Sequence, residues 1–176
     1  MKRIALAQIS TLLLLTLSVS CKNVKTEKQI NDLRPSILKQ LDGEWIAKGK
    51  VMGDDVEYNL TVRPVLNFTF SELHMIDVAN PPQYEARVFI GYDTASKMII
   101  SHWLDSFGPA FSIPHGTGKI DNNTIEFTIP YTDGTFRDRI TLNEKEKTWS
   151  LLIESFKDST SWSTFAEYTI SRKTKN

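Results

Sequence analysis

The chain contains one cysteine, only three histidines and no excess charge of either sign, because 21 Lys and Arg residues balance 21 Asp and Glu residues. A single cysteine cannot form a disulfide bond within the chain. Balanced charge gives no general attraction to a polyanion, so nucleic acid is not expected as a partner. The sequence also lacks a metal-ligand cluster, a phosphate-binding glycine loop, the GxSxG motif of hydrolases and long repeats. These absences leave no cofactor, no metal and no catalytic residue to assign.

The N-terminus has the features of an export signal. Lys2 and Arg3 precede an apolar run from residue 4 to residue 17, and small residues follow at 18–20. A membrane-spanning helix needs about 20 apolar residues, which is longer than this run. Residues 1–20 are therefore predicted to be a signal peptide of the lipoprotein type, and they are excluded from the fold.

Cys21 follows this segment directly, and the stretch LSVSC resembles the lipobox of bacterial lipoproteins. In those proteins the cysteine carries a diacylglyceryl group and becomes the mature N-terminus. Leu17 stands four residues before Cys21 rather than three, so ordinary cleavage after Ser20 remains an alternative. Acyl chains bury at about 0.8 kcal/mol per methylene, so lipidation would hold the protein to a membrane. We expect a lipid-anchored protein of the bacterial cell envelope, facing the periplasm or the surface, with residues 21–32 as a flexible tether.

Residues 33–176 have the size of one ordinary domain. Residues 35–41 predict a short helix, with Pro35 in its first turn and Gly43 just after its end. Beyond it, apolar and polar residues alternate as in strands with one buried face. Strands are expected near 44–52, 56–62, 65–76, 84–92, 97–104, 116–120, 123–129, 135–142, 147–155 and 161–172. The strand at 65–76 changes phase, so we expect a bulge or sharp bend near Ser71.

The connections between these strands are short, and no helical pattern is long enough for a parallel crossover. An antiparallel meander of about ten strands twists and exposes two edges, and closure into a barrel removes both edges. The sequence therefore predicts an all-β fold, a single antiparallel up-and-down β-barrel of about 8–10 strands with a short N-terminal helix.

Gly43-x-Trp45 on the first predicted strand and Arg172 on the last resemble the lipocalin or calycin arrangement. A narrower similarity, to a large bacterial family of uncharacterised lipocalin-like proteins, is carried by five motifs: Leu41-x-Gly43-Glu44-Trp45, Gly91-Tyr92-Asp93, Trp103-x-Asp105-Ser106-x-Gly108, Gly116-x-Gly118 and Glu167-Tyr168-x-Ile170-x-Arg172. The resemblance implies a calyx-shaped barrel in which Arg172 packs over Trp45 and closes the base. It implies no particular activity.

The predicted partner is a small apolar or amphipathic molecule inside the barrel. Asp138 shares its strand phase with Phe136 and Ile140, and His102 shares its phase with apolar neighbours. Inward polar groups of this kind either satisfy a buried hydrogen-bond network or orient a ligand in an apolar pocket. The candidate ligand-binding residues are Tyr58, Phe68, Tyr92, His102 and Asp138.

Three other interpretations stay open at this point. A filled barrel that serves as a structural or interaction protein has the same sequence pattern. Haem is disfavoured, because nitrobindin-type barrels take their iron ligand late in the chain and no histidine follows His115. A hydrolase is disfavoured, because the period of two residues sends His102 and Asp105 to opposite faces of one strand. The oligomeric state is not predicted.

Overall fold

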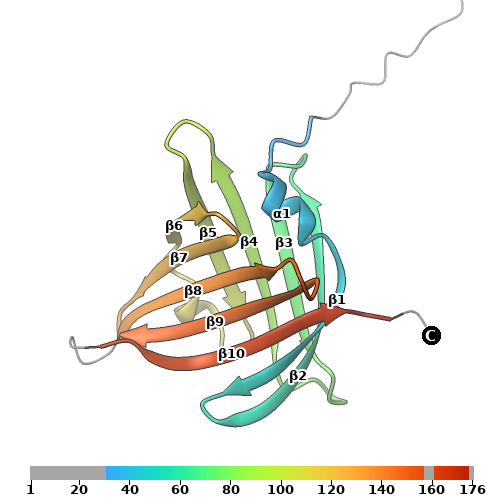
Figure 1. Ribbon diagram of the computed structural model, residues 1–176. Coiled ribbons are helices and arrows are strands. Elements are labelled where there is room, and N and C mark those ends of the chain that lie inside the picture. Colours follow the sequence, from blue (N-terminus) through green and yellow to red (C-terminus); the bar gives the residue numbers. More distant parts are fainter. Residues whose placement is uncertain (1–30, 157–160, 175–176) are drawn as a thin grey trace, which may run out of the picture.

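Ten antiparallel strands close into a barrel in the computed structural model, which describes residues 31–156 and 161–174 (Figure 1). Each strand pairs with the next in the chain, and β1 also pairs with β10. The elements are α1 (Ser36–Gln40), β1 (Gly43–Val51), β2 (Asp54–Val65), β3 (Phe70–Asp77), β4 (Glu85–Asp93), β5 (Met98–Asp105), the 3-10 helix η1 (Pro109–Phe111), β6 (Gly116–Asp121), β7 (Thr124–Tyr131), β8 (Gly134–Asn143), β9 (Thr148–Phe156) and β10 (Ser163–Arg172). The predicted fold class, an up-and-down barrel with a short N-terminal helix, is confirmed.

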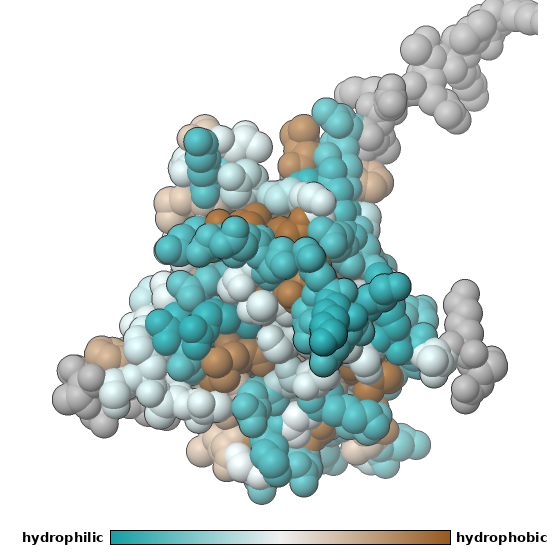
Figure 2. All heavy atoms as spheres, in the orientation of Figure 1, coloured by the Kyte–Doolittle hydropathy of each residue, from teal (hydrophilic) through white to brown (hydrophobic). Residues whose placement is uncertain are grey.

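The alternating pattern forms the barrel wall as expected. In β2, Tyr58, Leu60 and Val62 are buried, while Thr61 and Arg63 between and after them are exposed. The same alternation in the other strands sends apolar side chains inward. Figure 2 shows the outer face over β8–β10, where hydrophilic and neutral residues predominate and smaller hydrophobic areas lie between them.

One strand boundary was predicted wrongly. Residues 65–76 do not form a single strand with a bulge near Ser71, because a turn at residues 66–69 separates β2 from β3. Leu66, Asn67 and Phe68 adopt left-handed backbone conformations with φ of 49°, 55° and 64°. The Thr69 hydroxyl donates a hydrogen bond of 2.7 Å to the Leu66 carbonyl, which fixes the turn.

The connections alternate between two ends of the barrel. The closed end carries α1 and the turns at residues 66–69, 94–97, 122–123 and 144–147. The mouth, at the opposite end, carries the connections at residues 52–53, 78–84, 106–115 and 132–133. Large buried side chains fill the barrel toward the closed end, among them Ile99, Ile125, Ile140 and Trp149. The half of the barrel near the mouth is not filled in this way.

Candidate functional site

A cavity of about 620 Å³ occupies the half of the barrel near the mouth. Ligand pockets in proteins have volumes of roughly 300–1,000 Å³. Nine aromatic side chains line it: Tyr58, Tyr84, Trp103, Phe107, Phe111, Tyr131, Phe136, Phe165 and Tyr168. Its aliphatic lining includes Met75, Ile129 and Ile153. A more open depression of about 910 Å³ lies against β1, β2, β9 and β10, and charged residues such as Lys48, Glu57 and Glu167 stand among its lining residues.

Asp138 is the buried charged group of this cavity. Its residue is only 2% exposed, and it lies among the cavity-lining residues. Among the described residues, no hydrogen bond or ion pair reaches its carboxyl group. Burial raises the pKa of Asp138 to about 8, because the cavity wall solvates the ionised form poorly. The carboxyl group is thus available either as a proton donor or as a counter-charge for a guest.

The inward position of Asp138 follows from the alternation along β8. The flanking Arg137 and Arg139 point outward, and the guanidinium of each donates a hydrogen bond of 2.7 Å to the Glu154 carboxylate on β9. These ion pairs hold both guanidinium groups on the outer face, away from the cavity. Asp138 therefore has no cationic neighbour on the inner face of its own strand.

A second polar group lies closer to the mouth. The Trp103 indole donates a hydrogen bond of 3.2 Å to the Asp105 carboxylate, and the Tyr84 hydroxyl donates one of 3.3 Å to the same oxygen atom. Tyr58 contacts Tyr84 and Tyr168 through ring edges, with centroids 5.7 Å and 5.8 Å apart. Burial raises the pKa of Tyr84 and of Tyr168, so both hydroxyls keep their protons and remain hydrogen-bond donors.

The structure brings together two of the five residues predicted to bind a ligand. Tyr58 and Asp138 both line the cavity. Phe68 lies in the turn between β2 and β3, and Tyr92 lies near the closed end of β4, so neither reaches the cavity. His102 is exposed on the outside of β5, where its ring centroid is 5.9 Å from that of His115.

The expected inward position of His102 was wrong because the inner face of β5 has the opposite phase. Ile99 and Ser101 are buried, and Trp103 and Asp105 continue this face into the cavity. From the sequence, Trp103-x-Asp105 was recognised only as part of a family motif. Ser101, Trp103 and Asp105 are spaced two residues apart, and residues with this spacing lie on the same face of a strand. This spacing could have placed Trp103 and Asp105 on the inner face.

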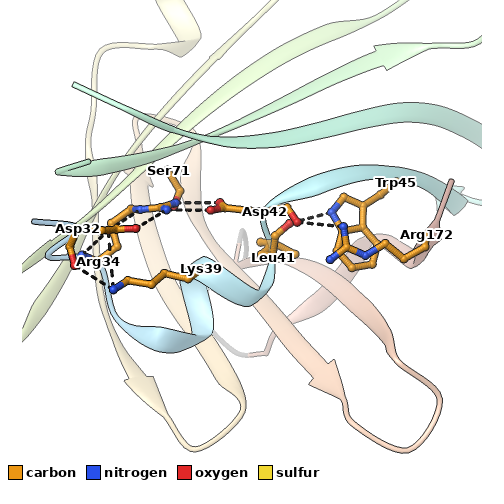
Figure 3. A network of polar contacts seen from close by, with 8 residues as sticks. All are labelled: Asp32, Arg34, Lys39, Leu41, Asp42, Trp45, Ser71 and Arg172. Atoms are coloured by element: carbon orange, nitrogen blue, oxygen red, sulfur yellow. Dashed lines mark hydrogen bonds and ion pairs between the residues drawn. The ribbon is translucent and has the colours of Figure 1, made fainter. Parts of the chain in front are cut away.

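The predicted base of the barrel lies at the closed end (Figure 3). The Arg172 guanidinium lies over the Trp45 indole, 3.7 Å from the ring centroid, and donates a hydrogen bond of 2.9 Å to the Asp42 carbonyl. The indole N–H donates a hydrogen bond of 2.7 Å to the Leu41 carbonyl. Gly43 has φ of +134°, and a Cβ atom there would lie 1.9 Å from the Arg172 Nη1 atom. Gly43 therefore provides the space in which the arginine packs.

Arg34 is a buried closed-end residue that the sequence analysis missed (Figure 3). Its guanidinium donates hydrogen bonds of 2.8–3.1 Å to the carboxylates of Asp32 and Asp42 and one of 2.8 Å to the Ser71 hydroxyl. These five bonds match the five N–H groups of a guanidinium. Arg34 thus ties the segment before α1 to β3 and has no donor left for a ligand. Asp32, assigned to the tether from sequence, belongs to this network.

Two arrangements considered from the sequence, a catalytic pair and a metal cluster, can be compared with the described residues. His102 faces outward and Asp105 faces the cavity, so these two residues do not form a catalytic pair. Within residues 31–156 and 161–174, no three His, Cys, Asp or Glu side chains gather as a metal site would require. The chemistry that the cavity can offer is apolar contact, tyrosine hydrogen bonding and the carboxyl group of Asp138.

Comparison with curated proteins gives no match to the chain. Residues 34–172 match a family described as a protein of unknown function, DUF1579. The matched span runs from the buried Arg34 to Arg172 over Trp45, and it includes the whole barrel. The chain therefore belongs to the DUF1579 family.

Proposed function

We propose that this protein binds a small apolar or amphipathic molecule in the mouth half of its barrel. The observation that carries the proposal is the cavity of about 620 Å³, with its nine aromatic side chains and the buried Asp138, whose carboxyl group has no partner among the described residues. Apolar walls supply affinity by removing ligand surface from water, and a few polar groups orient the ligand. A barrel that served only as a filled scaffold would gain nothing from this space.

The proposal includes a lipocalin-like calyx. The contact between Arg172 and Trp45 supports it, because this contact closes the end of the barrel opposite the cavity. Haem is not part of the proposal. No histidine stands among the residues that line the cavity in the described chain, and His102 and His115 are exposed outside it.

Export and lipid anchoring at Cys21 also belong to the proposal, although residues 1–30 lie outside the described part of the chain. Within the described residues, no helix combines the length and the hydrophobicity needed to cross a bilayer. The described chain begins beside α1 at the closed end (Figure 1). A lipid at Cys21 would therefore tether the protein by the end opposite the mouth.

The anchoring proposal predicts that Cys21→Ser moves the protein from the membrane fraction to the soluble envelope fraction, because the acylated thiol is removed. Fractionation of bacteria that express either chain, followed by immunoblotting, gives the measurement. Ser18→Ala, which keeps the cysteine, serves as the control. Continued membrane association of the Cys21→Ser chain would remove lipidation from the proposal.

Native mass spectrometry tests ligand binding directly. The full-length Cys21→Ser chain is exported from bacteria, and its native mass is compared with its denatured mass before and after exposure to a lipid extract. Val56→Trp places a large ring in the cavity, and Thr61→Trp places the same ring on the outer face of the same strand. We expect a dissociable added mass in the parent and in Thr61→Trp but not in Val56→Trp. A parent chain that stays bare after exposure to lipid would contradict the proposed function.

A further inference from the structure

The charged side chains that line the cavity are all acidic. They are Asp54, Asp105, Asp133 and Asp138. No Lys, Arg or His stands among the lining residues that the structure describes. The chain as a whole has no net charge, so this sign bias is a property of the cavity and not of the composition. A carboxylate ligand such as a fatty acid would find no cationic side chain among these residues and would lie near several carboxyl groups.

Asp138 distinguishes this site from an ordinary acidic surface. The exposed Asp54 and Asp133 are solvated by water, whereas Asp138 is 98% buried. The buried Glu72 on the outside of β3 accepts hydrogen bonds from Arg63 at 2.7 Å and from Arg87 at 2.8 Å. Asp138 has no such partner among the described residues. A buried ionised carboxyl group requires a counter-charge or hydrogen-bond donors. The cavity has space for a ligand that supplies them.

The aromatic lining also suits a cation. Tyr131 on β7 lines the same cavity as Asp138 on the neighbouring β8. Phe136 packs edge-on against Tyr131 and Phe165, with centroid distances of 5.5 Å and 5.2 Å. Aromatic faces attract ammonium groups, and aromatic cages recognise quaternary ammonium ligands. An anion gains nothing from such faces.

We propose that the ligand carries a positive charge, as an amphipathic amine or quaternary ammonium whose cationic group lies between the Asp138 carboxylate and the surrounding aromatic rings. Its apolar part extends toward Phe107 and Phe111 at the mouth, which are 69% and 51% exposed. This inference rests on the proposed function and specifies the chemical class of the ligand.

The proposal includes a proton release on binding. Free Asp138 has a pKa of about 8 and must ionise to pair with a cation, so below pH 8 the affinity should rise by up to about tenfold per pH unit. Tyr58, Tyr131 and Tyr168 face the same space from β2, β7 and β10, and burial raises the pKa of each, so they keep their protons in this range. Asp105 on β5 faces the space as well.

Three matched probes test the sign of the ligand charge: 4-phenylbutylamine, 4-phenylbutanol and 4-phenylbutyrate. Isothermal titration calorimetry is carried out at pH 8 on the full-length Cys21→Ser chain, which carries no acyl group that competes for the cavity. We expect the amine to bind at least tenfold more tightly than the alcohol and the acid to bind most weakly. Asp138→Asn should weaken amine binding at least tenfold and leave alcohol binding within threefold. Asp121→Asn, at an exposed carboxyl group of β6 at the closed end, should change amine binding less than threefold.

The pH dependence is measured with 4-phenylbutyltrimethylammonium, whose charge does not titrate. Its affinity should rise between pH 6 and pH 8 in the parent and in Asp105→Asn, and should stay level in Asp138→Asn. Unchanged alcohol binding shows that the Asp138→Asn chain is folded. Equal affinities for amine and alcohol, tighter binding of the acid, or a level pH profile in the parent would overturn the cationic ligand while leaving an apolar ligand in place. Failure of all three phenylbutyl probes to bind would overturn the cationic inference and also count against the proposed function.

Discussion

Replacing Asp138 with asparagine should stabilise the folded protein, and the gain should grow with pH. The carboxyl group is 98% buried and partnerless among the described residues, and burial raises its pKa from 3.8 to about 8. Below pH 4 the group is protonated in both the folded and the unfolded chain, so it adds no ionisation cost. Between pH 4 and pH 8 the unfolded chain loses this proton while the folded chain keeps it. Folding stability therefore falls as pH rises, and the loss is complete above pH 8.

The size of the effect follows from the two pKa values. Each pKa unit corresponds to about 1.4 kcal/mol, so the full interval from 3.8 to about 8 gives an upper limit of about 6 kcal/mol. Water in the cavity solvates part of the carboxylate and lowers this value. We expect Asp138→Asn to gain about 2–4 kcal/mol in unfolding free energy at pH 8, relative to the difference at pH 4.5, because about 1 kcal/mol of the loss has already occurred at pH 4.5 and the folded carboxyl group is only half ionised at pH 8.

Urea unfolding of the ligand-free parent and variant at pH 4.5, 6, 7 and 8 measures this difference. Asp133→Asn removes an exposed carboxyl group from the same cavity, and its stability difference should stay within about 0.5 kcal/mol over this range. All other carboxyl groups are present in both chains, so the difference between parent and variant isolates the substituted position. A stability difference for Asp138→Asn that is the same at pH 4.5 and pH 8 would refute the buried, partnerless carboxyl group.

Two further predictions concern the closed end. Arg34→Met should lower the unfolding free energy by about 2–4 kcal/mol, because it leaves two partly buried carboxylates without their cation, and Arg34→Lys should recover part of this loss. Urea unfolding measures both variants. A loss below 0.5 kcal/mol for Arg34→Met would contradict the network. Gly43→Ala should lower the unfolding free energy by about 2 kcal/mol or more and change tryptophan fluorescence, because the added Cβ atom collides with Arg172. Gly53 also has a positive φ, of +98°, but no atom lies near its Cβ position, so Gly53→Ala should lose only the backbone contribution. Equal losses for the two glycine variants would contradict the close packing of Arg172.

Most strand positions were predictable because each strand has one buried face and one solvent-exposed face. In β8, for example, Asp138 and Ile140 are buried, and the arginines on either side of Asp138 face outward. The same rule failed at residues 66–69, where Leu66, Phe68 and Phe70 alternate as in a strand but the first two lie in a turn. Periodicity reports the spacing of apolar residues and not the backbone angles between them.

The candidate site was harder to predict, because it depends on which face of each strand is inside. Tyr58 and Asp138 stood among clear apolar neighbours, so their phase gave their position. On β5 both phases contain apolar side chains, and Trp103 was missed while His102 was placed inward. Arg34 was missed for a different reason, because its partner Ser71 is 37 residues away and only the folded barrel brings the two together.

The two ends of the barrel treat buried charge in opposite ways. At the closed end, Arg34 has a partner for every guanidinium N–H group, so its burial is offset within the protein. In the cavity, Asp138 is buried to a similar degree with no partner among the described residues. An asparagine has nearly the same shape and would avoid the ionisation cost, so packing alone does not account for an aspartate at this position. A cationic ligand would account for the aspartate, because the ligand supplies the counter-charge of the Asp138 carboxylate. Binding to the folded state then stabilises the protein and offsets the cost of ionising this buried group.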